Sequence, residues 1–151
     1  MFAMRWMALG LVVVLTLCSF ACKSRTRARM DATATKPGTL AELGTEVGLA
    51  FPPSSRLLGV SRENGMDDLV MFKVELPRRD LASFLATCPV PADEFEEGSA
   101  GLLGPDQGFW DPSKALHLRT GQIVRHARAT NVGVDDGRPE IAILYIVDHG
   151  T

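Results

Sequence analysis

The sequence lacks three features that would define a function class at once. Its N-terminal apolar run, Met7–Leu17, is about half of the roughly 20 residues that a helix needs to cross a bilayer. It contains no His-Glu-x-x-His, Gly-x-Ser-x-Gly, phosphate-loop or dinucleotide-binding motif, so no common catalytic or nucleotide-binding chemistry is indicated. It also has no internal repeat. What remains is a chain of 151 residues with a net charge of −2, long enough for one folded domain.

Cysteine is also scarce, with only three residues at positions 18, 22 and 88. If the first 21 residues are removed and Cys22 is modified, Cys88 is alone and cannot form an intramolecular disulfide. It follows an apolar helical pattern and precedes Pro89, which favours a buried, unreactive thiol. If Cys22 is unmodified, a Cys22–Cys88 disulfide remains an alternative.

The first 21 residues have the pattern of a secretory signal peptide. Arg5 provides a positive flank, Met7–Leu17 a short apolar core, and Ser19 and Ala21 small residues at the exit. This order of features is typical of an export signal that is later removed. We therefore expect the mature protein to leave the cytoplasm.

The four residues Ser19-Phe20-Ala21-Cys22 resemble the lipobox of bacterial lipoproteins, although Ser19 stands where that pattern prefers an aliphatic residue. The resemblance implies cleavage before Cys22, a diacylglycerol on its thiol, acyl chains such as palmitate, and a lipid-anchored protein of the bacterial cell envelope. Two alternatives remain. Ser19 and Ala21 also fit ordinary signal peptidase, which would give a secreted protein, and the signal could stay uncleaved as an anchor.

Residues 22–37 are expected to form a flexible basic tether, because they are rich in Ser, Thr and Ala and show no periodicity. They carry a net charge of +4, whereas residues 38–151 carry 10 basic and 17 acidic side chains, a net charge of −7. A basic stem suits anionic lipid headgroups, whereas an acidic domain argues against nucleic acid as a partner. In the lipoprotein family Asp after the modified cysteine marks inner-membrane retention in enteric bacteria, so Lys23 favours the outer membrane.

Residues 38–151 predict a single α+β domain. A short helix should start after Thr39, with Glu42 at capping-box distance, and end at Gly48. A β-hairpin is expected at 56–62 and 68–76 around Asn-Gly, followed by the main helix at 78–87. A long irregular loop, 90–118, leads to a second hairpin that starts near 122–129 and ends with the apolar strand 141–147.

This order predicts a mainly antiparallel four-stranded sheet with the main helix on one face, and the other face covered by the N-terminal helix or the long loop. In the first hairpin, alternate residues of its second strand should face the core: Val70, Phe72, Val74 and Leu76. The arrangement of hairpin, Leu-Pro-x-x-Asp-Leu helix start, Trp-Asp-Pro and terminal strand is similar to small envelope lipoproteins of uncharacterised function, over residues 50–148. That resemblance implies no activity.

Two groups of residues are candidate contacts for an envelope protein partner. Phe109, Trp110 and Asp111 lie on the long loop, and the aromatic pair is either a lid over the sheet or an exposed anchor. Glu94, Glu96 and Glu97 belong to an acidic run, Asp93–Glu97, which is solvated or meets a basic partner. No metal or cofactor is expected, and the turn aspartates 67–68 and 135–136 should bind local backbone.

The sequence therefore predicts a non-catalytic binding module held at the membrane through Cys22. A small hydrolase is the alternative. It would need at least three of its candidate side chains to meet in one pocket; these candidates are Asp67, Asp68, Asp111, His117, His126 and His149.

Overall fold

A computed structural model describes residues 38–65 and 68–150 of the chain. The chain divides into two units, residues 1–34 and 35–151, and all the described residues belong to the second. The predicted signal peptide, Cys22 and the basic tether lie outside the described residues.

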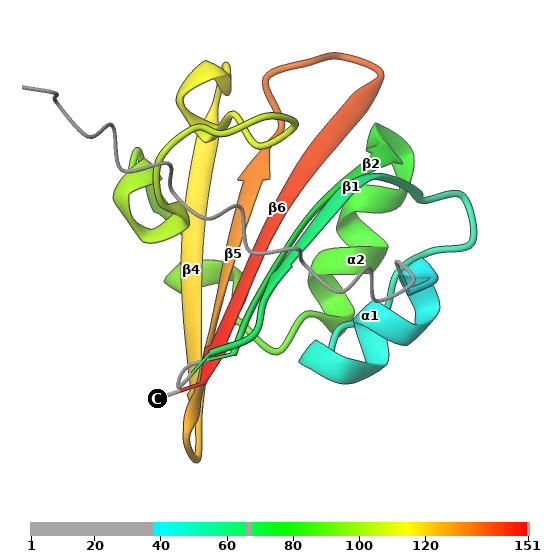
Figure 1. Ribbon diagram of the computed structural model, residues 1–151. Helices are drawn as coiled ribbons and strands as arrows, with labels where there is room; N and C mark the ends of the chain where they lie inside the picture. The colour runs from blue at the N-terminus through cyan, green and yellow to red at the C-terminus, as the bar shows by residue number, and fades with distance from the viewer. Residues whose placement is uncertain (1–37, 66–67, 151) are drawn as a thin grey trace, which may run out of the picture. The chain divides into compact units, whose positions relative to one another are not determined.

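The described domain is mostly β and is built on a six-stranded antiparallel sheet in the order β1-β2-β6-β5-β4-β3 (Figure 1). The strands are β1 (Arg56–Glu63), β2 (Leu69–Pro77), β3 (Glu96–Glu97), β4 (Leu118–Arg125), β5 (Arg128–Asp135) and β6 (Ile141–Gly150). Two short helices, α1 (Leu40–Val47) and α2 (Leu81–Thr87), accompany it. Four 3₁₀ turns complete the domain: η1 (Arg78–Asp80), η2 (Ala92–Glu94), η3 (Ala100–Leu103) and η4 (Pro112–Lys114).

Strand β6 is buried on both faces, as its continuous apolar run predicts. Ala142, Leu144 and Ile146 belong to one core, whereas Ile143, Tyr145 and Val147 belong to a second core on the other face. Strand β2 alternates in the same way, and the predicted core positions in it are confirmed: Val70, Phe72, Val74 and Leu76. Both faces of the sheet must therefore be covered.

Helices α1 and α2 cover the first face. The predicted capping box of α1 is confirmed, because the Glu42 amide donates to Thr39 Oγ1 (3.3 Å) and the Thr39 amide donates to Glu42 Oε2 (2.7 Å). The helix ends at Gly48, whose φ of 72° is the left-handed conformation common at helix ends. From α2, Leu81 and Phe84 are buried in the same core.

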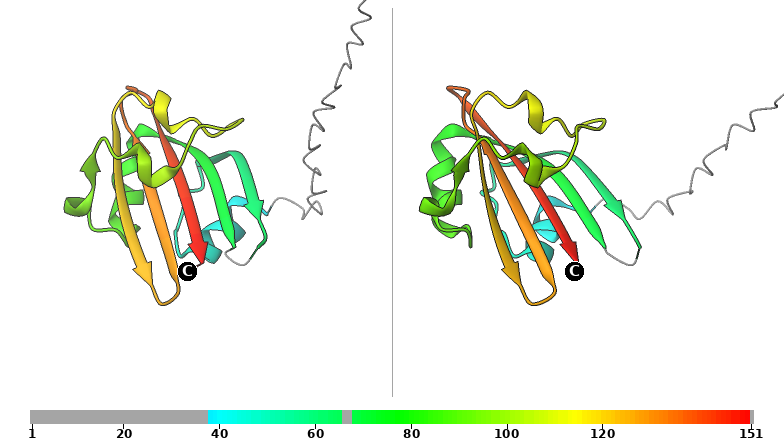
Figure 2. Two further views of the ribbon diagram at one scale, coloured as in Figure 1. Left: turned by 60° about the vertical axis from the view of Figure 1, so that its left-hand side comes forward. Right: turned by 90° about the vertical axis from the view of Figure 1, so that its left-hand side faces the viewer.

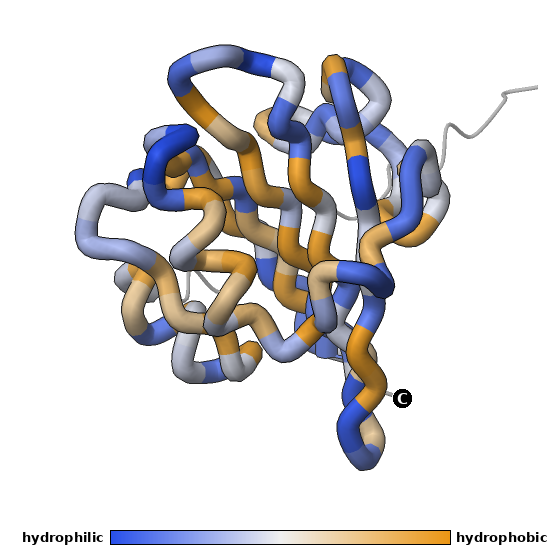
Figure 3. The backbone as a smooth tube through the Cα atoms, turned by 180° about the vertical axis from the view of Figure 1, so that it is seen from behind, coloured by the Kyte–Doolittle hydropathy of each residue, from blue (hydrophilic) through white to orange (hydrophobic). Residues whose placement is uncertain are grey.

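The second face is covered by the long loop. Residues 98–117, which we call the lid, run across the sheet on the side opposite the two helices (Figure 2). Figure 3 shows apolar strand segments beneath both coverings. Of the two coverings expected for this face, the structure has the loop.

The predicted four-stranded sheet with one main helix is wrong. The segment read as a single strand from residue 122 is two strands, β4 and β5, joined at His126-Ala127. That turn carries no Gly or Asn, which are the usual signals for a two-residue hairpin. Strand β3 has only two residues, too few to show an alternating pattern. The expected main helix is seven residues of α-helix after one 3₁₀ turn.

The β4–β5 turn generates a stability prediction. His126 has a φ of 54° and is the one described non-glycine residue with a positive φ. Asn tolerates this conformation, whereas a β-branched residue is strained in it. We expect His126→Asn to match or exceed the wild-type free energy of unfolding and His126→Val to lower it by about 1–2 kcal/mol, measured by urea denaturation. Equal stabilities for the two variants would contradict the left-handed conformation of residue 126.

Candidate functional site

The predicted contact residues fall in two places. Phe109, Trp110 and Asp111 belong to the lid, whereas Glu94, Glu96 and Glu97 lie at the β3 edge of the sheet. The lid is internally folded, since Gln107 and Trp110 form a β-bridge with hydrogen bonds of 2.7 and 2.9 Å. The Ser113 hydroxyl and amide both donate to Asp106 (2.5 and 3.1 Å).

Trp110 is a core anchor in this conformation and has an exposed fraction of 0%. Its indole N–H donates to the carbonyl of Leu103 (3.0 Å), so its one polar group is satisfied. Its ring meets the Tyr145 ring edge-on, with a centroid separation of 5.3 Å. The aromatic pair thus acts as a lid over the sheet, and Trp110 does not form an exposed surface.

The lid fits the sheet at two glycines. A Cβ atom at Gly133 on β5 would lie 2.5 Å from Leu103 Cδ1, and a Cβ atom at Gly59 on β1 would overlap the ring of Phe109. A side chain at Gly59 would therefore require the Phe109 ring to move, and a side chain at Gly133 would require the Leu103 side chain to move. Leu103, Phe109 and Trp110 are therefore seated against β5, β1 and β6 respectively.

Asp111 fastens the lid through charge. It accepts hydrogen bonds from the Lys73 ammonium group on β2 and from the Tyr145 hydroxyl on β6 (3.1 Å). Lys73 and Tyr145 are cross-strand partners, and the ammonium group lies 5.2 Å from the ring centroid of Tyr145. Burial alone would raise the pKa of Asp111, but Lys73 and Tyr145 hold it below its usual value. Burial and the Asp111 charge raise the pKa of Tyr145, so this hydroxyl stays a donor.

Lys73 and Tyr145 were not among the residues predicted from the sequence. The available signal was a single cation that follows two apolar residues on one strand face, on which Leu69, Met71, Lys73 and Glu75 lie. The three side chains Lys73, Asp111 and Tyr145 satisfy one another, and the geometry is that of a clamp between the lid and the sheet.

The acidic edge is exposed. Glu96 and Glu97 pair with Thr120 and Arg119 of β4 and end the sheet on that side. Glu94, Glu96 and Glu97 are all solvent-exposed, and charged side chains on an edge strand oppose unwanted strand pairing. Their carboxylates are accessible to a partner. Glu97 lies 3.5 Å from His117 Nε2.

The β5–β6 turn anchors the other end of the lid. The buried carboxylate of Asp135 accepts from the amides of Leu116 (3.1 Å), His117 (3.0 Å) and Gly137 (3.2 Å), which confirms the predicted backbone role for Asp135. For Asp136 that prediction is wrong, because its carboxylate binds side chains. Asp136 pairs with His117 and, at 2.9 Å, with Arg119. The hydrogen bond and charge of Asp136, followed by Glu97, raise the pKa of His117.

The candidate residues of a hydrolase do not converge in the described part of the chain. His117 and His126 flank opposite ends of the eight-residue strand β4, about 30 Å apart along the strand. His149 lies four residues beyond Tyr145, about 13 Å along β6 from the Asp111 clamp. Asp68 lies at the far end of the sheet, where its carbonyl accepts from Gly150 (3.0 Å), and Asp67 lies outside the described residues.

Residues 38–65 and 68–150 contain no cluster of three or more His, Cys, Asp or Glu side chains suited to a metal ion. Within the same ranges, no helix has the length and hydropathy needed to cross a membrane. Cys88 is a free, half-buried thiol, and burial raises its pKa.

Comparisons with protein-family models, with curated proteins and with solved structures found no match.

The glycine contacts predict how the lid responds to added volume. Gly133→Val should lower the free energy of unfolding by about 1–3 kcal/mol, because the new side chain collides with Leu103. Trp110 is the only tryptophan after Trp6, so its emission in the mature chain should shift to longer wavelength as the lid is displaced. Gly101→Val is the matched control, since a Cβ atom there meets nothing within 4 Å. Equal effects of the two substitutions would contradict the close packing of Leu103 against Gly133.

The Asp111 clamp predicts a pH dependence. Because Lys73 and Tyr145 hold the pKa of Asp111 below its usual value in the folded state, its contribution to stability is present at neutral pH and is lost as the pH falls through that lowered pKa. Asp111→Asn should reduce the free energy of unfolding by about 1–2 kcal/mol at pH 7, and the difference should shrink towards pH 3. Urea denaturation at both pH values measures it, with exposed Asp93→Asn as control. A difference that is constant between pH 7 and pH 3 would contradict the clamp.

Proposed function

We propose that this protein is a lipid-anchored bacterial envelope protein whose folded domain acts as a non-catalytic binding module. The observation that carries the proposal is the N-terminal order of Arg5, the apolar run Met7–Leu17 and Ser19-Phe20-Ala21-Cys22. The basic tether supports it, because each basic residue near an anionic membrane surface contributes roughly 1 kcal/mol. Lys23 favours the outer membrane as the site.

The contact surface of the module is the acidic edge, which we define as Glu94, Glu96, Glu97 and the neighbouring Leu116. Leu116 supports this choice because it is 68% exposed and directly precedes His117, which pairs with Glu97. Trp110 does not belong to this surface because it is buried. A partner of matching chemistry is an envelope protein with a basic segment beside an apolar residue.

The anchor is tested by intact mass and by fractionation of cells that produce the full chain. We expect a mature chain that begins at Cys22 and carries added diacylglycerol and acyl mass, found in the membrane fraction. Cys22→Ala should abolish both the added mass and the membrane location. Cys18→Ala is the matched control, because this cysteine lies inside the predicted signal and should have no effect. An unmodified wild-type chain in the soluble fraction would refute the anchor.

A further inference from the structure

A groove with no charged lining residue lies beside α1, on the helix-covered side of the sheet. Its cavity volume is about 440 Å³. One wall is the outer side of α1, with Leu40, Ala41 and Thr45, and the other is the segment from Leu49 to Ser55. In a domain with a net charge of −7, an uncharged groove of this size is unusual surface.

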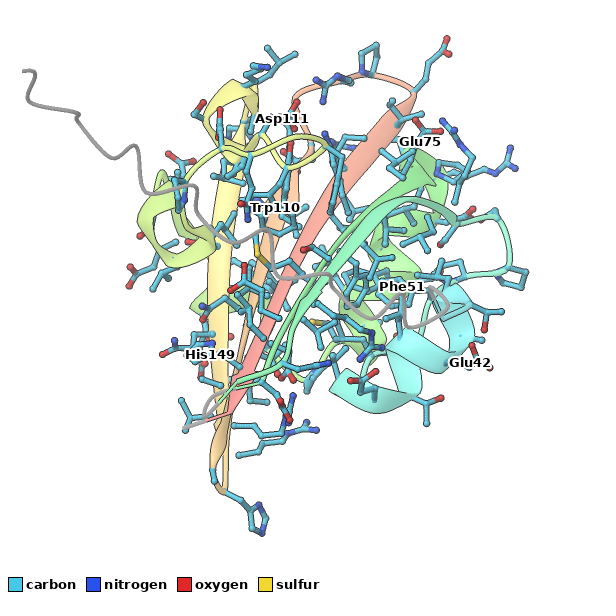
Figure 4. All side chains as sticks on the ribbon, in the orientation of Figure 1. Glu42, Phe51, Glu75, Trp110, Asp111 and His149 are labelled. Atoms are coloured by element: carbon cyan, nitrogen blue, oxygen red, sulfur yellow. The ribbon has the colours of Figure 1, made fainter. Side chains whose placement is uncertain are left out.

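The groove rests on the main core and is therefore preformed. Leu49 is buried, and the Phe51 ring stacks on Phe84 at a centroid separation of 5.5 Å and meets Phe72 edge-on at 5.9 Å. Its rim is exposed at Ala41, Ala50 and Pro53. Figure 4 shows Phe51 between α1 and the sheet.

One lining residue of this groove has a buried polar atom without a hydrogen bond. The Ser55 hydroxyl has no partner among the described residues. A buried hydroxyl without a partner costs free energy. An occupant that matches the uncharged lining is mainly apolar. The acyl chains of a phospholipid have this property.

The covalent chain places the groove close to the predicted anchor. Gly38 is the first described residue, and the lining begins at Leu40 and Ala41 in the first turn of α1. Fifteen residues separate Cys22 from Gly38, and they can span at most about 50 Å. A bilayer that holds Cys22 therefore lies within that distance of Gly38.

The charge distribution of the chain also favours the groove as the surface that faces the membrane. Anionic headgroups attract the tether, with its net charge of +4, and repel the rest of the domain. Of the two carboxylates on α1, Glu46 forms an ion pair with Arg62 at 2.5 Å, and Glu42 accepts a hydrogen bond from the Thr39 amide in the capping box. None of the residues that line the groove is charged.

We propose that the α1 groove is a membrane-docking seat that takes an acyl chain from the bilayer in which Cys22 is anchored. The proposal rests on the lipid anchor proposed above. When docked, the first turn of α1 and the segment 49–55 lie against the membrane, and the domain has a fixed orientation on its surface.

The test uses lipidated protein, purified from membranes and reconstituted into phosphatidylcholine vesicles, with hydrogen exchange as the readout. Amides of α1 and of residues 49–55 should exchange at least tenfold more slowly than in the Cys22→Ser mature chain in solution. The double substitution Ala41→Lys and Ala50→Lys, at exposed rim positions, should abolish this slowing. Ala86→Lys, at an exposed alanine of α2, is the matched control and should retain it. Trp110 emission, from the other face of the sheet, checks that every variant is folded.

The outcomes separate the two proposals. No slowing in a protein whose mass confirms the lipid would overturn the groove and leave the anchor intact. If the mass shows no lipid, the Cys22→Ser chain is mixed with the same vesicles: groove-dependent binding would support the seat, and no binding would overturn it. Slowing without vesicles that grows with protein concentration would assign the groove to a second copy of the chain, and would also overturn the proposal.

Discussion

The fold depends on strand β6, because both of its faces are apolar and both must be shielded from water. Strand β6 places Leu144 and Ile146 in one core and Tyr145 and Val147 in the other, so exposing either face would leave a large apolar surface in solvent. Two short helices cover the first face, and no described helix remains for the second. The lid therefore covers the second face, as a layer of helices would. This role explains why a long loop contains a fully buried tryptophan.

The sequence predicted the local features of this fold better than the count of its strands. The cap of α1, the alternation of β2 and the two-sided burial of β6 each follow from periodicity or capping chemistry over a few residues. The β4–β5 turn could not be found in this way, because His126-Ala127 uses a left-handed histidine where glycine or asparagine is usual. Strand β3 is defined only by the pairing of Glu96 and Glu97 with β4. This pairing is a tertiary contact, which a local sequence pattern does not reveal.

In the candidate site, too, the local features could be predicted from the sequence and the long-range contacts could not. Phe109, Trp110 and Asp111 could be singled out because an aromatic pair on a long loop is conspicuous, but the choice between lid and exposed anchor depends on what lies beneath. Lys73 and Tyr145 hold the lid against the sheet through Asp111. These two residues are 72 positions apart in the sequence. Only the pairing of β2 with β6 makes them neighbours. A cation that directly follows apolar residues on one strand face, as Lys73 follows Leu69 and Met71, is the signal by which such a clamp could be sought.

Electrostatics links the two proposed surfaces. The acidic edge borders β4 on one side of the sheet, and β1 forms the opposite edge (Figure 1). The Glu46–Arg62 ion pair joins α1 to β1. An anionic bilayer that attracts the basic tether repels Glu94, Glu96 and Glu97 over about one Debye length, roughly 8 Å at physiological salt. Docking through the uncharged groove and repulsion at the acidic edge therefore favour the same orientation, in which this edge points away from the lipid. A basic partner can then reach it without competing with the membrane.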